Sequence, residues 1–137
     1  MTRAKKAKPP AKNPVSDAHV LLFDQYIKKH QALLNLRDWR IERAGKREKA
    51  VMAALLSVEH EHKLARYAVG TDFGAAEVTP HNLEATAVHE LLHLFLRPLM
   101  DVCMAEGEHN DTVLEYEHAV IIVLTQLLVN AYGDDAE

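Results

Sequence analysis

Residues Ala87–Leu96 read AVHELLHLFL, and the rest of the chain is interpreted around this stretch. It places His89, Glu90 and His93 in the pattern H-E-x-x-H, on an apolar background that predicts a buried helix. Residues four apart lie on the same face of an α-helix, so the two imidazoles can reach one ion. Glu90 lies at the edge of that face, where a carboxylate can reach a metal-bound water. The pattern predicts a zinc site with His89 and His93 as ligands and Glu90 as catalytic base.

The same spacing also arises by chance, and the three residues would then be ordinary core or half-exposed polar side chains. The apolar neighbours favour the metal site. Burying two imidazoles and a carboxylate costs free energy unless a partner satisfies them, and a metal ion is such a partner.

A catalytic zinc site usually has three protein ligands and one open position, and nothing soon after His93 supplies the third. The last predicted helix carries an apolar stripe that should face the core, and Glu117 precedes members of that stripe by three, four, seven and eleven residues. Glu117 is therefore the favoured third ligand. His109 is the next candidate, followed by His118 or Glu115, and a surface Glu117 paired with a lysine or arginine would leave the ion short of a ligand. The stripe consists of Val120, Ile121, Leu124, Leu127 and Leu128.

The chain has 137 residues, which predicts one domain over residues 15–137 after a tail at 1–14. The tail is rich in lysine and proline and has no acid, so we expect it to be disordered. The remainder has 11 basic and 20 acidic residues, a net charge of −9. A domain with this net negative charge is not expected to bind nucleic acid. Any contact with nucleic acid would be weak and would be made by the basic tail.

A single cysteine, Cys103, excludes an internal disulfide and fits a reducing cytoplasm. No uninterrupted apolar run approaches the roughly 18–20 residues that span a membrane. The longest run, Ala119–Leu124, should be a buried helix segment. No apolar core of a signal peptide follows the basic start, so we expect a cytoplasmic protein with no membrane contact.

Caps and periodicity place the remaining elements in an α+β domain. We expect the second and third strands to pair antiparallel in a short three-stranded twisted sheet. The elements are a helix from Asp17 to about Leu34, strands over 36–42, 53–62 and 64–70, the metal-site helix from Pro80 to about Arg97, a partly helical crossover over 100–110, and a last helix from Thr112 to about Tyr132.

Four other histidines are expected to have no chemical role. His19 and His30 lie on the first helix without visible partners and are predicted on the surface. His60 and His62 share one face of the second strand, where an exposed polar edge is favoured over a second metal site.

H-E-L-L-H after a short sheet, followed by a helix with an inward glutamate, resembles the zincin metallopeptidases whose third ligand is a glutamate. Residues Glu117–Leu128, EHAVIIVLTQLL, loosely match E-x-x-A-N-x-F-A-x-x-L-L of the immunity-repressor proteases of phages and mobile elements, with Val120 and Ile121 in place of Ala-Asn. The layout over residues 16–132 is similar to small metallopeptidases encoded in phages and prophages. The resemblance implies a zincin-like fold, with an N-terminal helix and a C-terminal ligand-bearing helix.

Related families fit less well. Leu96 and Leu99 stand where metzincins have a glycine and a third histidine, and Leu99 also replaces the third histidine of H-x-x-x-H-x5-H endoribonucleases. SprT-like proteases, which act on DNA–protein crosslinks, have a histidine near the position of His109, but the following glycine is Asn110 here. One cysteine cannot build their zinc ribbon.

The expected function is a zinc metallopeptidase that hydrolyses a peptide or amide bond, with Glu90 as general base. His109, Tyr116 and Tyr67 are candidates to stabilise the oxyanion. The alternatives are a non-catalytic zinc-stabilised protein that binds a partner, and a DNA-associated SprT-like protease. No motif specifies the substrate or the oligomeric state.

Overall fold

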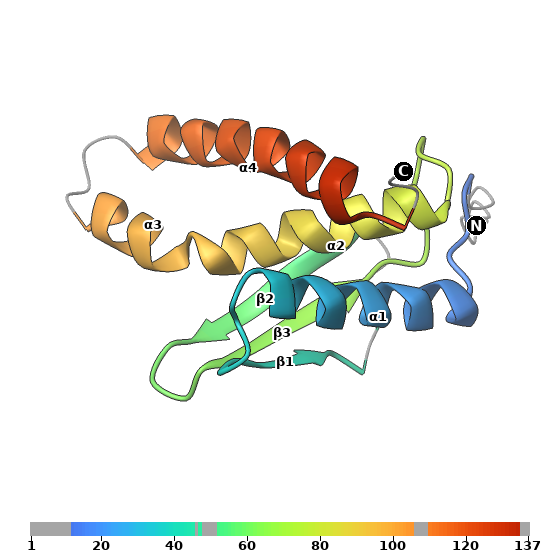
Figure 1. Ribbon diagram of the computed structural model, residues 1–137, viewed down its shortest axis with the longest axis horizontal. Coiled ribbons are helices and arrows are strands. Elements are labelled where there is room, and N and C mark those ends of the chain that lie inside the picture. Colours follow the sequence, from blue (N-terminus) through green and yellow to red (C-terminus); the bar gives the residue numbers. More distant parts are fainter. Residues whose placement is uncertain (1–11, 46, 48–51, 106–109, 135–137) are drawn as a thin grey trace, which may run out of the picture.

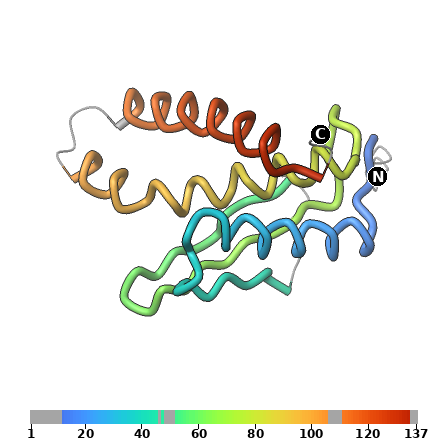
Figure 2. Tube along the Cα trace, viewed as in Figure 1, coloured from blue at the N-terminus to red at the C-terminus, as the bar shows by residue number. Residues whose placement is uncertain are grey.

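The computed structural model describes residues 12–45, 47, 52–105 and 110–134, so most of the predicted tail and His109 lie outside the described part of the chain. It is an α+β fold with four helices and a three-stranded mixed sheet (Figures 1 and 2). In chain order the elements are α1 (Asp17–Leu33), β1 (Arg40–Arg43), β2 (Ala53–Glu59), β3 (Leu64–Val69), α2 (Pro80–Phe95), α3 (Arg97–Met104) and α4 (Asn110–Tyr132).

The sheet has the order β1-β3-β2, so β3 is central and β2 has one open edge. β2 and β3 pair antiparallel, as predicted, and β1 runs parallel to β3. α1 and α2 pack on the sheet through one apolar core that includes Phe23, Tyr67 and Leu91. α4 packs on α2, and Figure 1 shows it on the outside of the molecule, away from the sheet. α2 is therefore the central helix of the fold.

α1 begins at a reciprocal cap. The Ser16 hydroxyl accepts from the His19 amide, and the His19 ring accepts from the Ser16 amide. The prediction that His30 lies on the surface is wrong, because its side chain is fully buried between α1 and α2. His30 falls on the same face of α1 as Phe23 and Ile27. A polar partner on α2 offsets part of the free-energy cost of burying its imidazole.

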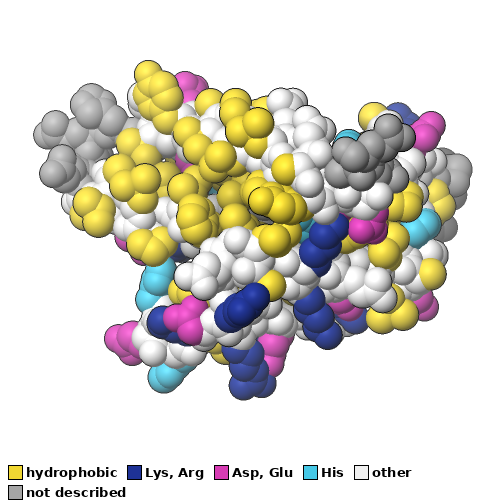
Figure 3. Space-filling view, in the orientation of Figure 1, with side chains coloured by type: hydrophobic (Ala, Val, Ile, Leu, Met, Phe, Trp, Pro, Cys, Tyr) yellow, Lys and Arg dark blue, Asp and Glu magenta, His cyan; other side chains and the backbone are white. Residues whose placement is uncertain are grey.

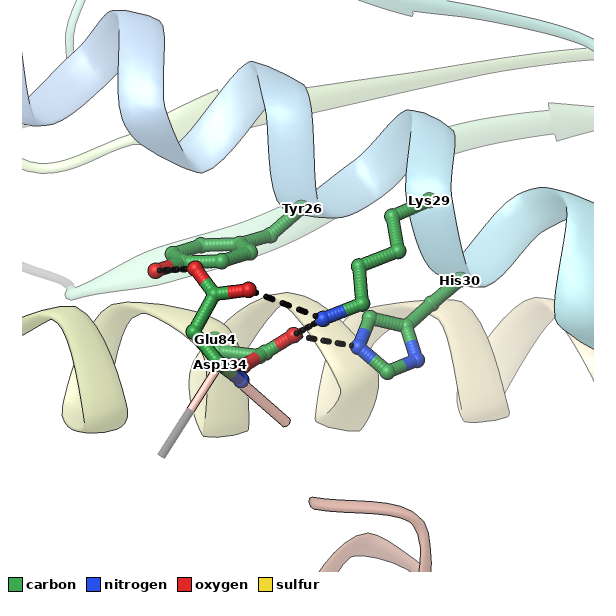
Figure 4. A network of polar contacts seen from close by, with 5 residues as sticks. All are labelled: Tyr26, Lys29, His30, Glu84 and Asp134. Atoms are coloured by element: carbon green, nitrogen blue, oxygen red, sulfur yellow. Dashed lines mark hydrogen bonds and ion pairs between the residues drawn. The ribbon is translucent and has the colours of Figure 1, made fainter. Parts of the chain in front are cut away.

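That partner is Glu84, which is 1% exposed and lies at the centre of a polar network (Figure 4). His30 Nε2 and Lys29 Nζ donate to the same Glu84 oxygen at 2.8 and 2.7 Å. The other oxygen accepts from the Asp134 amide at 2.8 Å, and the Asp134 carboxylate accepts from the Tyr26 hydroxyl. The network ties α1, α2 and the segment after α4 together.

The observed strand boundaries differ from the predicted ones mainly at the start of β1 and at the end of β2. β1 begins at Arg40, because residues 36–39 form a turn closed by a hydrogen bond from the Trp39 amide to the Leu36 carbonyl. β2 ends at Glu59, so His60 and His62 lie in the turn rather than on a strand face. His60 Nε2 lies 3.1 Å from the Asp101 carboxylate, and both histidines are exposed.

α2 starts as predicted, with the Thr79 hydroxyl accepting from the Asn82 amide and Pro80 in the first turn. It ends at Phe95, and a separate helix, α3, occupies much of the predicted crossover, with Pro98 in its first turn. Gly133 follows α4, as predicted. A Cβ there would lie 2.4 Å from the Val129 carbonyl oxygen, so only glycine allows this close turn.

The core-facing stripe of α4 is narrower than predicted. Ile121 is fully buried and Leu124 and Leu128 are partly buried, but Val120 and Leu127 are 46% and 59% exposed. Most of the run Ala119–Leu124 is likewise not buried. The physical reason is that α4 is an outer helix, which packs mainly on α2 and less on α3 and leaves its other sides uncovered.

The expectation that no segment spans a membrane was based on the length of uninterrupted apolar runs. Within the helix Asp111–Tyr132, an 18-residue window has a mean hydropathy of 1.5, so this helix is long and apolar enough to cross a membrane by length and composition. Only 11% of that window is buried inside the structure. One such helix is weak evidence, so this property alone does not place α4 in a membrane.

Candidate metal centre

Three histidines converge where α2 faces the first part of α4. His89 and His93 come from one side of α2, one turn apart, and His118 comes from α4. One ring nitrogen from each lies within 4.8 Å of the corresponding nitrogens of the other two. The ring centroids are 5.0 Å apart for His89 and His93, 5.6 Å for His89 and His118, and 5.2 Å for His93 and His118. We refer to these residues as the three-histidine cluster.

Glu117 lies beside this cluster rather than within it. Its side chain is 9% exposed and projects inward, as expected from the apolar stripe of α4. Its Oε1 lies 2.7 Å from Nδ1 of His93, within ion-pair distance. In the tautomer with the proton on Nδ1, the Nε2 lone pair of His93 would be free to bind a metal ion.

The environment of His89 favours the neutral imidazole. Burial lowers its pKa, and the neighbouring His93 and His118 lower it further, while Glu117 acts in the opposite direction. Metal ions bind the neutral ring, so this shift suits a ligand.

Glu90 lies next to His89 on α2 and points toward the sheet. Its Oε2 accepts a hydrogen bond of 3.0 Å from the Leu55 amide of β2. Burial raises the pKa of Glu90 to about 7, against the effect of this hydrogen bond. Since β2 pairs with β3 on its other side, this contact places the unpaired edge of β2 against Glu90 of α2.

Two cavities open beside these residues. The larger, about 500 Å³, has His89 and Glu90 on its wall. Thr125, which also lines it, has a buried hydroxyl with no hydrogen-bond partner in the described part of the chain. The smaller, about 240 Å³, is lined by Glu90, His93, Arg97 and residues 53–55 of β2. The remaining residues that line the larger cavity are Met52, Ala53, Ala85, Thr86, Ile122 and Gln126.

The other residues that the sequence suggested as metal ligands or oxyanion stabilisers are not part of the three-histidine cluster. Glu115 is exposed on α4, and His109 is outside the described residues. The Tyr67 hydroxyl donates to Asp24 of α1 at 2.6 Å, within the core on the α1 side. Tyr116 is 71% exposed and lines a groove between α3 and α4.

Sequence reasoning ranked His118 below Glu117 and did not consider Arg97 or Thr125. A signal for His118 was present, since it precedes the buried Ile121 by three residues and Thr125 by seven, which is helical spacing toward the same side. Arg97 had no such signal, because its position beside the site depends on the break between α2 and α3.

Comparison with known proteins gives no relative: no family model, no curated protein and no solved structure matches this chain significantly.

Proposed function

We propose that this protein is a zinc-dependent hydrolase of peptide or amide bonds with a zincin-like arrangement of α2, α4 and the edge strand β2. The observation that carries the proposal is the convergence of His89 and His93 on α2 with His118 on α4, next to the half-buried carboxylate of Glu90.

The residues present fit a zinc ion. Three imidazole nitrogens and an open side form a donor set found in catalytic zinc sites. With Zn–N distances of about 2.1 Å, two tetrahedral ligands lie roughly 3.4 Å apart, so nitrogens within 4.8 Å need only small side-chain rotations. A ligand histidine usually donates its other ring N–H to a carboxylate, and Glu117 is placed to accept it from His93.

We therefore favour His118 as the third ligand and Glu117 as the residue that orients His93. Direct ligation by Glu117 is the alternative. It would require the carboxylate to leave Nδ1 of His93 and replace His118 at the ion.

A zinc ion held here would lower the pKa of a bound water and polarise a carbonyl group. The chain supplies the remaining chemistry. The carboxylate of Glu90 accepts a proton from the attacking water and passes it to the leaving amine. Its hydrogen bond from the Leu55 amide holds it at the edge of the sheet, between the two cavities.

Beyond Leu55, whose amide already binds Glu90, the unpaired edge of β2 suits an extended peptide, because such strand edges bind peptides through main-chain hydrogen bonds. A substrate on this edge would place a side chain in the 500 Å³ cavity, whose walls include Met52, Ala85 and Ile122. We expect a medium-sized, mainly apolar side chain there. Arg97, in the smaller cavity, would face the substrate backbone on the other side of Glu90.

The test combines metal analysis with hydrolysis. The purified full chain should contain close to one zinc ion per molecule, and chelation should lower its melting temperature. A library of short peptides should be cleaved by the zinc form. Glu90→Gln should keep the zinc and lose activity by about 10²–10⁴-fold. Glu115→Gln, an exposed glutamate on α4, is the matched control and should change neither property.

A non-catalytic, zinc-stabilised protein that binds a partner is the second candidate. The observation in its favour is the large exposed apolar face of α3 and α4, which is unusual for an isolated monomer. If the zinc form melts higher than the apo form but cleaves no peptide in the library, the zinc is structural and the proposed hydrolase activity is contradicted. Absence of stoichiometric zinc would contradict both.

A further inference from the structure

α4 carries a second apolar stripe beside the one that packs on α2. Val113, Tyr116, Val120, Val123 and Leu127 follow one another at spacings of three, four, three and four residues. This is the spacing of the contact positions of paired helices. We call these five residues the α4 seam. The core stripe through Ile121, Leu124 and Leu128 lies on a different side of the helix, so burial in the protomer leaves most of the seam uncovered.

The seam is wide because α3 extends it. Tyr116, Val120, Val123 and Leu127 are 46–71% exposed, as are Leu99 and Val102 of α3. An apolar groove of about 250 Å³ runs between the two helices. Figure 3 shows hydrophobic side chains gathered on the face formed by α3 and α4. With about 100 Å² for each half-exposed large residue, these six present on the order of 600 Å² of apolar surface, close to one partner's share of a standard interface.

We propose that a second copy of this chain covers the seam, with α4 of the two copies packed antiparallel about a two-fold axis. The axis passes between Val120 and Val123, so that Val120 meets the partner subunit's Val123. Tyr116 then meets the partner subunit's Leu127. A two-fold interface of this kind uses the same surface twice, which a self-complementary apolar stripe allows.

The charges on α4 favour this direction. Asp111, Glu115 and Glu117 all lie in its first third, and residues 119–132 include no charged side chain. A parallel pair would place the acidic ends side by side. An antiparallel pair places each acidic end against the uncharged half of the other helix, and it also aligns the helix dipoles favourably.

The charge distribution on α4 also disfavours a lipid bilayer as the partner that covers the seam. α4 contains no lysine or arginine, which helices lying on anionic membranes use on their polar face. Crossing the bilayer would also pull Ile121 and Leu128 from their contacts with α2 and expose Glu117 to hydrocarbon.

Sedimentation velocity of the full chain over the micromolar range tests the interface. The wild type should form a concentration-dependent dimer. Val120→Glu brings two like charges together at the axis and should raise the dimer dissociation constant by about a hundredfold or more. Leu21→Glu is the matched control, since Leu21 is 60% exposed on α1, and it should leave the dimer intact. Far-ultraviolet circular dichroism of both variants checks that the fold is retained.

Crosslinking tests the direction without depending on a destabilised variant. In a Cys103→Ser background, Tyr116→Cys and Leu127→Cys chains should form an interchain disulfide when mixed and little when each is alone. Crosslinking of each variant with itself would show a parallel pair and overturn the proposed arrangement.

A wild type that stays monomeric throughout the concentration range would overturn the proposal. So would flotation of the monomer with phosphatidylcholine–phosphatidylglycerol vesicles that is lost in Val120→Glu, because the seam would then be a membrane surface. None of these measurements depends on zinc or on catalysis.

Discussion

Glu117 Oε1 lies 2.7 Å from Nδ1 of His93, and this contact joins α4 to α2 beside the three-histidine cluster. Glu117 and His118 are consecutive on α4, so a small rotation of that helix would exchange which of them faces the α2 histidines. The contact with His93 holds one particular rotation. In this rotation the carboxylate of Glu117 contacts Nδ1 of His93, and the imidazole of His118 belongs to the three-histidine cluster.

The two α4 residues should therefore differ in their effect on zinc affinity. His118→Ala removes a proposed ligand, whereas Glu117→Gln removes a partner that orients His93 and should weaken zinc binding by about 10–100-fold. The expected order of loss is His118→Ala greater than Glu117→Gln, measured by competition with a chromophoric chelator. Glu115→Gln is the control and should bind zinc as the wild type does. The reverse order would show that Glu117 is the direct ligand.

Acid should unfold this protein partly through Glu84. Burial acts to raise the pKa of Glu84, but hydrogen bonds from Lys29, His30 and the Asp134 amide outweigh it, so the pKa lies below its ordinary value of 4.5. A carboxylate with a lowered pKa in the folded state contributes stability that is present above pH 4.5 and lost as the pH falls through the folded-state value. Urea unfolding at a series of pH values should show this loss.

Glu84→Gln is the variant that isolates this effect. It keeps the size of the side chain but removes the charge that Lys29 and His30 face, and it should reduce the free energy of unfolding at neutral pH by about 1–3 kcal/mol. Its stability should also depend less on pH between pH 3 and 5 than that of the wild type. An unchanged acid dependence would mean that other carboxylates dominate.

Tyr67 should matter for stability and not for hydrolysis. Burial and the hydrogen bond to Asp24 raise the pKa of its phenol far above the ordinary value, which keeps the hydroxyl protonated and bound to α1. Tyr67→Phe should cost about 1 kcal/mol of unfolding free energy and leave the rate of peptide cleavage by the zinc form unchanged. A large fall in that rate without a change in stability would return Tyr67 to the list of oxyanion stabilisers.

Several features of the fold follow from local sequence. Thr79-Pro80 starts α2 and Gly133 ends α4, because caps and the proline constraint act within a turn of the chain. The antiparallel pairing of β2 with β3 follows from two apolar strands joined by a short turn. Boundaries such as the start of β1 and the break between α2 and α3 depend on more distant contacts, and they were predicted less accurately.

The sequence by itself determined that His89 and His93 share one side of a helix, with Glu90 at its edge, because helical periodicity places residues four apart on the same face. Tertiary packing alone decided which α4 residues meet them. It also decided that Glu84 makes the burial of His30 favourable and that Val120 and Leu127 face outward. The physical reason is that periodicity defines a face only relative to the helix's own axis. The rotation of α4 against α2, and the number of its sides that are covered, result from the packing of the whole chain.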